Sequence, residues 1–394
     1  MPPSIRPAAP LLRRVPLAVA VTAVFGLMCD PDAACGQPLG AAAEPPPLYI
    51  GQPPLEPLPE SGFAGLPVRM AIDNVPPWPR WFFGAGGLVM TRTLPGGAAT
   101  MEPLGGVQLT TAAAGATWPG GVDLHLGRWL GPEQHHAVEA IYWGVYGIGS
   151  SGSFTADPAA IVAIPQAPDI EVGGASADAY LDGASAQRIS RADVINDVEI
   201  NWVYSLWDRP EFLPRQRTVN LMWLAGFRFF QVNDTLTLVT TAGDPALGGL
   251  DLDVATNNNL YGGQVGAKFD WRFLPQLRLN VVPKFMIGGN AISNKTTLAT
   301  DTGTSATFPG GDPVAVRSTL GVFAWLGSVD TGLAWDVSDH WTLSMGYRVV
   351  GVGNIAQADG QWPTFIATPD SLSGLDAGSS TIIHGGFAGF EGRY

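Results

Sequence analysis

The last fourteen residues of the chain, Thr381 to Tyr394, alternate between two kinds of side chain. As an extended strand they place small residues, Phe390 and Tyr394 on one face and Glu391 and Arg393 on the other. An apolar outer face, a charged inner face and an aromatic last residue are typical of the closing strand of a transmembrane β-barrel. This segment therefore predicts a fold class and a membrane compartment together.

Composition supports strands rather than helices as the apolar elements. The 394 residues are 46% hydrophobic and 14% charged, with 50 Gly and 34 Pro. Beyond the N-terminus there is no run of about eighteen apolar residues, so transmembrane helices are not predicted. Apolar content that is delivered by alternation indicates strands with a lipid-facing side.

Charge excludes one class of partner. The formal net charge is −13, and the only lysines are Lys268, Lys284 and Lys295. Because an acidic, lysine-poor chain lacks the basic surface that phosphate backbones require, no nucleic-acid binding is expected.

The N-terminus has the organisation of a secretory signal peptide, predicted at 1–43. Arginines precede a short apolar stretch from Val15 to Met28, and small residues then offer cleavage after Gly36 or Ala43. Either cut removes Cys29 and Cys35, so the mature protein is expected to be cysteine-free. Residues 44–80 are proline-rich and are predicted to form an extended periplasmic lead-in.

From Trp81 onward the pattern has a period of two, which predicts strands. The predicted strands are 81–93, 103–113, 120–130, 137–148, 194–206, 217–230, 233–241, 259–271, 277–288, 322–335, 341–352 and 381–394. A tilted strand needs about 9–11 residues to cross the hydrocarbon layer, whereas soluble strands have about 5–6. We therefore predict an all-β fold, a transmembrane antiparallel up-and-down β-barrel over 81–394 with about twelve strands, in a range of about ten to sixteen.

Connection lengths predict which end of the barrel faces which compartment. Short turns near 231–233, 272–276 and 336–340 are expected in the periplasm. Longer connections at 207–216, 242–258, 289–321 and 353–380 are expected outside. Residues 148–193 are too long for a periplasmic turn in this scheme, and a further pair of strands is predicted there, near 160–164 and 183–190.

The two faces of these strands predict a lumen and a lipid surface. The predicted pore-lining residues are Glu199, Arg228, Lys268, Asp270, Arg278, Lys284, Asp330, Arg348, Glu391 and Arg393, with Asp123 and Asp336 also inward. The predicted lipid-facing aromatic residues are Trp202, Tyr204, Trp223, Trp271, Trp335, Trp341, Tyr347, Phe390 and Tyr394. The inward charges fit either a polar lumen that passes small solutes or a closed barrel whose charges pair with one another. About twelve strands are compatible with both, and the open pore is the preferred reading.

Other motifs predict little chemistry. His135 and His136 are adjacent in a short turn and lack a third ligand, so no metal site is expected. The acidic and amide residues between Asp251 and Asn259 depart from the calcium-binding loop pattern and are expected to form a hydrated loop. There is no Gly-x-Ser-x-Gly motif. No catalytic residue, metal or cofactor is predicted, and the chain is not expected to be an enzyme.

Six segments resemble a known family: 79–92, 124–144, 219–238, 257–272, 277–291 and 338–350. The pairing of LAGFRFFQVNDTLTL with NNLYGGQVGAKF is the most specific part of the likeness. These segments are similar to the planctomycete outer-membrane barrels called the beta-barrel porin-7 family. The resemblance implies an outer-membrane barrel that acts as a porin, without catalytic residues to transfer and without a defined solute.

The sequence thus predicts a barrel in the bacterial outer membrane that allows passive diffusion of small hydrophilic solutes. Two alternatives stay open: a non-conducting structural or adhesion barrel, and a secreted soluble β-sandwich that binds a partner. The expected partners are outer-membrane lipid, the barrel assembly machinery through the C-terminal strand, and further copies of the chain in a homo-oligomer.

Overall fold

A computed structural model describes residues 80–131, 134–157, 159–206 and 218–394. Every described residue belongs to one compact unit that begins at Pro77. The predicted signal peptide at 1–43 and the predicted lead-in at 44–80, apart from Arg80, lie outside the described residues.

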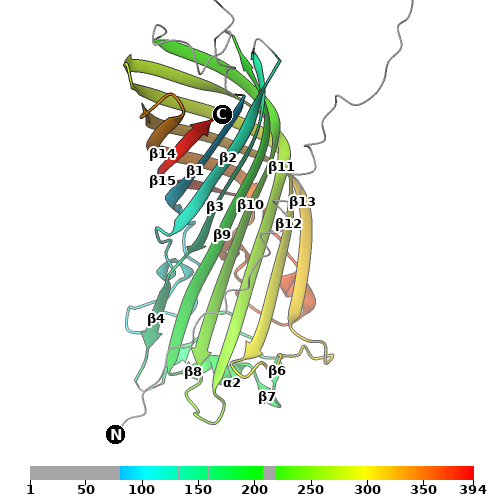
Figure 1. The fold of residues 1–394 in the computed structure, drawn as a ribbon. Helices are drawn as coiled ribbons and strands as arrows, with labels where there is room; N and C mark the ends of the chain where they lie inside the picture. Colours follow the sequence, from blue (N-terminus) through cyan, green and yellow to red (C-terminus); the bar gives the residue numbers. More distant parts are fainter. Residues whose placement is uncertain (1–79, 132–133, 158, 207–217) are drawn as a thin grey trace, which may run out of the picture. The chain divides into compact units, whose positions relative to one another are not determined.

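The described residues form a closed antiparallel β-barrel (Figure 1). Ten strands of the main sheet pair in a ring, in which β15 returns to β1 and β3 is followed by β9. The ring consists of β1 (Trp81–Arg92), β2 (Gly120–Leu130), β3 (His136–Ile148), β9 (Ala186–Ser205), β10 (Val219–Thr241), β11 (Gly249–Leu274), β12 (Leu277–Thr300), β13 (Ala315–Asp336), β14 (Trp341–Ile355) and β15 (Ser379–Arg393). An eleventh strand, β4 (Ser151–Thr155), pairs only with β9 and continues the line of β3. The predicted fold class is confirmed, with the ring at the lower end of the predicted range.

Two ends of the barrel can be distinguished by their connections. The "turn end" carries the β11–β12 turn at 275–276, the β13–β14 turn at 337–340 and Tyr394. The "loop end" carries 93–119, 156–185, 242–248, 301–314 and 356–378. In Figure 1 the turn end is at the top.

Two predictions about the strands were wrong, and both raised the predicted count. The predicted turn at 231–233 does not exist, because β10 runs without a break through Gln231 and Asn233, with Val232 buried between them. The predicted strand at 103–113 is instead a loop with a short hairpin contact between Leu104 and Val107 and a 3-10 turn, η2 (Thr111–Ala113). Gly105 and Gly106 at that hairpin have positive φ, which glycine adopts readily.

These corrections also move several loops. The connection predicted to be external at 207–216 lies outside the described residues, and the flanking strands pair at the turn end through Ser205 of β9 and Met222 of β10. The predicted loops at 242–258 and 289–321 shrink to 242–248 and 301–314, since β11 and β12 are 26 and 24 residues long. The predicted hydrated loop between Asp251 and Asn259 is therefore strand. The 148–193 segment lies at the loop end and contains β5 (Ile161–Val162), β6 (Glu171–Val172), β7 (Ala175–Ser176), β8 (Asp182–Ala184) and the short helix α2 (Asp178–Leu181).

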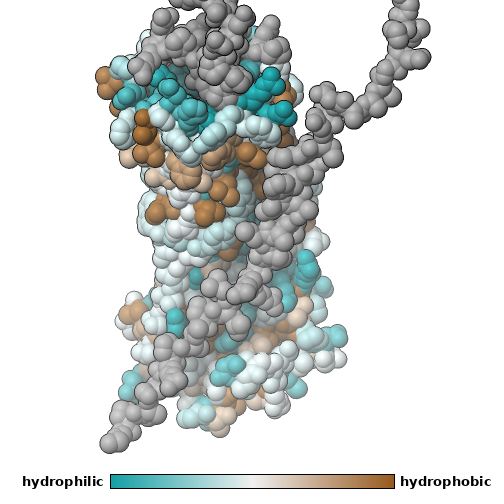
Figure 2. Space-filling model, viewed as in Figure 1, coloured by the Kyte–Doolittle hydropathy of each residue, from teal (hydrophilic) through white to brown (hydrophobic). Residues whose placement is uncertain are grey.

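The long strands exchange their apolar and polar faces along their length. Toward the turn end, β10 directs Trp223 and Phe227 outward, each about half exposed. Past Gln231 the outer side chains become polar, while Leu236 and Leu238 point inward and are buried. On the face in view in Figure 2, hydrophobic residues gather in the upper part of the barrel, below a hydrophilic rim, and paler residues cover the part below.

The apolar outer band has the height of a membrane. On β11 it runs from Trp271 to Tyr261, both about half exposed. That distance is about 33 Å along the strand and about 25 Å along the barrel axis for the usual tilt of about 40°. The remainder of β11, from Leu260 back to Gly249, projects beyond this band at the loop end. We call this part of β11, together with the parts of the other strands beside it, the "extension".

The lumen of the extension is filled by an apolar core. Inward side chains of the strands, such as Leu236 and Leu252, pack with loop residues that include Met101, Ile170 and Trp362. All five are at most 7% exposed. The loop-end connections thus fold back and cap the barrel. Among the described residues, no helix is both long enough and apolar enough to cross a membrane.

Candidate functional site

An apolar layer closes the lumen below the extension. It is contributed by β1, β3 and all the strands from β9 to β15. The largest side chains in it are Met90, Trp143, Phe230, Met286 and Leu326, each no more than 1% exposed. The Trp143 and Phe230 rings lie 5.9 Å apart between centroids. Because water reaches none of these side chains, the layer is packed from wall to wall.

A buried charged layer lies on the turn-end side of the apolar layer. Arg228 donates from Nε to Oδ1 of Asp197 at 2.7 Å and from Nη1 to Oγ of Ser328 at 3.1 Å. Glu199 accepts from Nζ of Lys284 at 2.8 and 2.9 Å. Arg228, Asp197 and Glu199 are at most 1% exposed and Lys284 is 8% exposed. Alternation positions these groups, because residues two apart on a strand share its inner face.

Arg348 extends this layer across the lumen. Its guanidinium on β14 binds Asp330 on the neighbouring β13 through two bonds of 2.8 and 3.0 Å. Its Nη1 also lies 2.8 Å from Oδ2 of Asp123 on β2. The same guanidinium stacks over Trp143, 5.2 Å from the ring centroid. Arg348 therefore joins the charged layer to the apolar layer.

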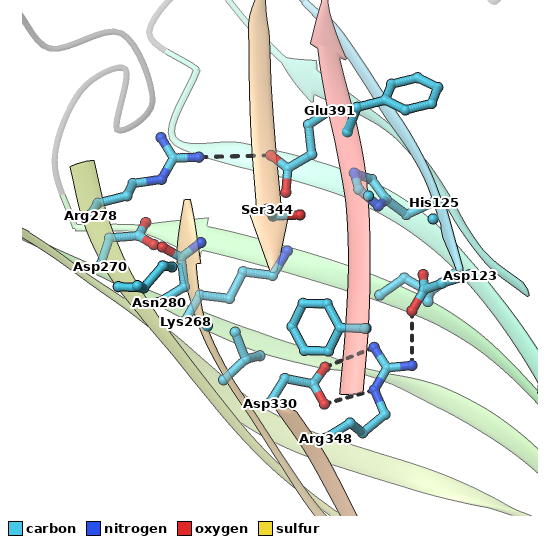
Figure 3. A pocket seen from close by; sticks show the side chains of 18 of the residues that line it. Asp123, His125, Lys268, Asp270, Arg278, Asn280, Asp330, Ser344, Arg348 and Glu391 are labelled. Atoms are coloured by element: carbon cyan, nitrogen blue, oxygen red, sulfur yellow. Dashed lines mark hydrogen bonds and ion pairs between the residues drawn. The ribbon is translucent and has the colours of Figure 1, made fainter. Parts of the chain in front are cut away.

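A polar cavity, the "vestibule", occupies the lumen at the turn end (Figure 3). Its volume is about 230 Å³. Its charged lining is balanced in sign: the basic residues are Lys268, Arg272, Arg278, Lys284 and Arg348, and the acidic residues are Asp123, Glu139, Asp270, Asp330 and Glu391. Four of the five basic residues come from β11 and β12. In Figure 3, Arg278, Asp270 and Lys268 lie on one side of the cavity and Asp123 and His125 on the other.

Ion pairs cross the vestibule as well. Lys268 of β11 binds Glu139 of β3, and Nη2 of Arg278 of β12 lies 3.7 Å from Oε2 of Glu391 of β15. Lys268 and Glu391 are 23% and 28% exposed at the side chain, so they are the members of these pairs that water reaches best. The vestibule could receive small polar solutes, but the charged and apolar layers form its floor.

The ten predicted pore-lining residues all point inward. Seven line the vestibule: Lys268, Asp270, Arg278, Lys284, Asp330, Arg348 and Glu391. Glu199 and Arg228 lie in the buried charged layer, and Arg393 is buried at the rim near Glu391. The nine predicted lipid-facing aromatic residues lie on the outer face and are between 39% and 57% exposed: Trp202, Tyr204, Trp223, Trp271, Trp335, Trp341, Tyr347, Phe390 and Tyr394.

Sequence reasoning missed three members of the site. Glu139 and His125 line the vestibule, and Asp197 pairs with Arg228. Alternation could have identified both acidic residues, because Glu139 interrupts the mostly apolar β3 and Asp197 lies two residues before Glu199 on the same face of β9. His125 stands over Gly84, where an added Cβ would lie 2.1 Å from the imidazole ring.

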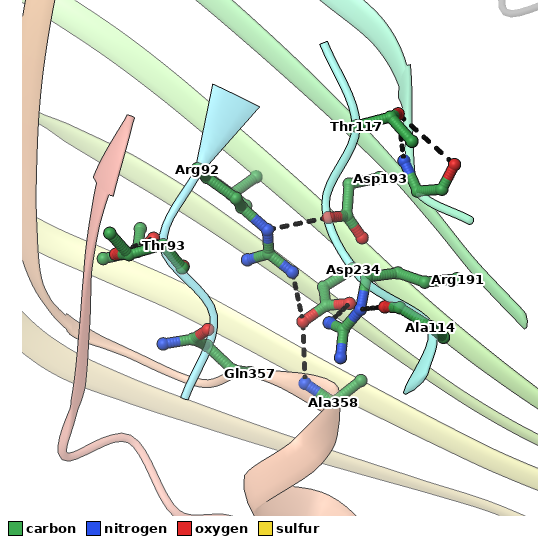
Figure 4. A network of polar contacts seen from close by, with 12 residues as sticks. Arg92, Thr93, Ala114, Thr117, Arg191, Asp193, Asp234, Gln357 and Ala358 are labelled. Carbon is green, nitrogen blue, oxygen red and sulfur yellow. Dashed lines mark hydrogen bonds and ion pairs between the residues drawn. The ribbon is translucent and has the colours of Figure 1, made fainter. Parts of the chain in front are cut away.

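A second charged network anchors the cap at the loop end (Figure 4). Arg92 lies 2.7 Å from Asp193 and 2.8 Å from Asp234, and Arg191 lies 2.8 Å from Asp234 and 2.6 Å from Asp359. Asp359 belongs to the 3-10 turn η3 (Ala358–Gln361) in the β14–β15 loop. Nε of Arg191 donates to the carbonyl of Ala114 in the β1–β2 loop at 3.1 Å. One arginine thus fixes two loops to the barrel wall.

Titratable groups outside these two networks have varied surroundings. Where the structure describes the chain, no group of three or more His, Cys, Asp or Glu side chains is placed to hold a metal ion. His136 lies against the lipid-facing aromatics, and its Nδ1 accepts from the Trp202 indole at 3.2 Å. In the cap, burial and the carboxylates of Asp178 and Glu102 raise the pKa of Asp182.

The sequence profile of the family described as "Putative beta barrel porin-7 (BBP7)" matches residues 88–377, most of the barrel. The chain belongs to this family. The match confirms the resemblance found in the sequence and makes the chain an outer-membrane β-barrel of a porin family. No curated protein matches the chain.

Solved barrels resemble this BBP7 chain in fold alone. The outer membrane protease OmpT from Escherichia coli has a TM-score of 0.42 and 11% identity, covering 80% of this chain and 97% of that one. The toluene transporter TbuX from Ralstonia pickettii has a TM-score of 0.30 and 11% identity, covering 80% and 90%. A major outer membrane protein from Thermus thermophilus has a TM-score of 0.28 and 10% identity, covering 79% and 99%.

Proposed function

We propose that this chain serves the bacterial outer membrane as a barrel that is closed to solutes at rest, with a structural or surface-attachment role. The apolar layer carries the proposal, because Trp143 and Phe230 at its centre are at most 1% exposed. Strand number gives the physical reason. Barrels of about eight strands are filled by side chains and those of about sixteen hold a channel, so a ring of ten lies near the filled limit.

Passive diffusion of small hydrophilic solutes is the second candidate. The vestibule favours it, since this polar cavity of about 230 Å³ carries charges of both signs, as a solute pathway would. In that role the apolar layer and the apolar core of the extension together form the gate, and both must open before anything crosses. Neither candidate includes catalysis or a cofactor. Outer-membrane lipid, the barrel assembly machinery and further copies of the chain are the proposed partners.

Single-channel conductance in planar lipid bilayers tests the two candidates. The full chain is expected to insert without current steps, whereas a triple variant with Trp143→Gly, Phe230→Gly and Asp359→Ala is expected to give discrete steps, because it opens the apolar layer and releases a loop of the cap. Phe227→Gly is the matched control, because it removes a phenyl ring from the outer face of the same strand. Insertion is checked by the altered electrophoretic mobility of the folded barrel. Regular steps from the unaltered chain would overturn the closed barrel in favour of diffusion.

A further inference from the structure

Two cations face each other on the outer surface of the extension. Lys295 of β12 lies directly opposite Arg317 of β13, and both side chains are exposed. Like charges directly opposite on an antiparallel pair are destabilising. Neither side chain forms an ion pair with a carboxylate in the part of the chain that the structure describes. The pair therefore presents two positive charges that no carboxylate neutralises in an ion pair.

Hydroxyl groups surround this pair on the same face. Two residues toward the turn end, Ser293 lies opposite Thr319. Two residues toward the loop end, Thr297 lies opposite Ala315. We call Ser293, Lys295, Thr297, Arg317 and Thr319 the "outer donor patch". Hydroxyl, ammonium and guanidinium groups all donate hydrogen bonds, and phosphate oxygens accept them strongly.

The nearest acidic neighbour on β11 does not satisfy the patch. Asp253 pairs in register with Thr297. Its Oδ1 accepts a hydrogen bond of 2.5 Å from Thr237 of β10, on the side away from Arg317. The carboxylate is therefore already engaged with a hydroxyl on another strand.

The height of the patch above the apolar band fits the lipid headgroups. A row of hydrogen-bonded polar side chains crosses the outer face at the loop-side limit of the band, from Tyr142 through Asn196 and Gln231 to Asn259, with distances of 3.0, 3.1 and 3.0 Å. Asn259 pairs with Ala291, which is four residues before Lys295. Four residues span about 13 Å along a strand and about 10 Å along the axis. The headgroup layer is roughly 5–8 Å thick, and long basic side chains bend back toward it.

The distribution of lysine strengthens the inference. The chain has three lysines at a net charge of −13. Lys268 and Lys284 lie inside the lumen and pair with Glu139 and Glu199. Lys295 is thus the one lysine directed outward, and it lies beside Arg317. Because the protein is acidic overall, a single cation on its surface would attract phosphate weakly, whereas two adjacent cations attract it more strongly.

We propose that the outer donor patch binds the phosphate of an anionic lipid headgroup in the leaflet at the loop end. Lys295 and Arg317 supply the charge, and Ser293, Thr297 and Thr319 supply neutral donors. The proposal rests on the position of the barrel in the membrane, and it is independent of whether the lumen conducts.

Lipid retention by the detergent-solubilised full chain tests the proposal. The probe is bis-phosphorylated lipid A, with phosphatidylcholine and inorganic phosphate as separate arms, and bound lipid is counted by native mass spectrometry. Lipid A is expected to bind saturably, and the double variant Lys295→Gln with Arg317→Gln is expected to bind at least about tenfold more weakly. Arg188→Gln is the matched control, because Arg188 is an exposed outward cation of the extension that faces Val239.

Three results would overturn the proposal. The double variant could retain lipid A as well as the unaltered chain does, which would exclude the outer donor patch as the binding site. Arg188→Gln could weaken binding equally, which would show that binding depends on the total surface charge and not on the outer donor patch. Inorganic phosphate at equal concentration could displace lipid A completely, which assigns the patch to a free ion. Thermal unfolding of each variant without lipid confirms that the barrel is intact in every arm.

Discussion

Arg348 and Asp123 join two parts of the barrel wall that are not adjacent, with 2.8 Å between Nη1 and Oδ2. Two strands, β15 and β1, separate their strands in the ring. Asp330 binds the same guanidinium from the adjacent strand. In this cluster of three inward groups one guanidinium serves two carboxylates, and removal of the arginine leaves both carboxylates in a site with little access to water.

Arg348→Gln is expected to lower the free energy of unfolding by about 3 kcal/mol, the lower part of the range for breaking a buried ion pair. Urea titration of the barrel in lipid vesicles, followed by tryptophan fluorescence, measures the change. Arg272→Gln is the control, because the Arg272 side chain is 21% exposed at the turn end. It should cost no more than about 1 kcal/mol. Equal losses of unfolding free energy in the two variants would show that the buried, cross-lumen position of Arg348 contributes no extra stability.

An arginine on the lipid face should be costly only inside the apolar band. Met345→Arg or Val281→Arg is expected to destabilise the barrel by about 2–4 kcal/mol, because the charge enters the hydrocarbon layer near its middle. Thr235→Arg should be nearly neutral, since Thr235 lies on the outer face of β10 beyond Gln231. The same refolding titration compares them. A large cost at Thr235 would mean that the membrane covers the extension.

Within the apolar band, sequence alone was enough to assign the faces. Lipid outside and water or charge inside impose a period of two, and the structure places Trp223 on the outer face and Lys284 in the lumen. The assignment of faces from the period failed where the surroundings of the strands change from lipid to water. In the extension, water is outside and an apolar core inside, so Leu236 and Leu252 continue the strands with inverted hydropathy. Those segments therefore looked like loops.

The pairing of charges across the lumen was also beyond the sequence. Lys268 binds Glu139 at a separation of 129 residues, and Arg191 binds Asp359 at a separation of 168. Such contacts depend on the number of strands and on their register, and a period of two fixes neither. One polar run, Gln231 to Asp234, resembled turn chemistry and changed the predicted strand count.

Pro283 marks a weak place in the wall that a substitution should strengthen. It lies within β12, where proline lacks the N–H that a strand interior requires. The β11–β12 ladder omits the pairs between Gly266–Lys284 and Phe269–Val281. Pro283→Val is expected to raise the free energy of unfolding by about 1 kcal/mol, the net value of one hydrogen bond. Pro283→Gly restores the N–H without a side chain and should gain less. No gain from valine would mean that the ladder is limited by something other than the proline.

The cap should open more often when its anchor is removed. Asp359 accepts 2.6 Å from Nη2 of Arg191 and 2.5 Å from Oγ1 of Thr111, and both partners are buried. Asp359→Ala removes these two bonds and leaves Arg191 with Asp234, so the β14–β15 loop should detach while the wall stays paired. Loss of about 2 kcal/mol from charge-assisted hydrogen bonds corresponds to roughly a thirtyfold larger open population.

Limited proteolysis with chymotrypsin measures that population, because the loop carries Leu372, which is 5% exposed, and Phe365, which is 45% exposed. Cleavage after Leu372 should accelerate in Asp359→Ala far more than cleavage after Phe365, since only the former requires the loop to leave the core. Asp370→Ala is the control, because Asp370 is exposed in the same loop and outside the network. Equal rates after Leu372 in both variants would contradict the anchoring role of Asp359 and place the stability of the cap in its apolar core.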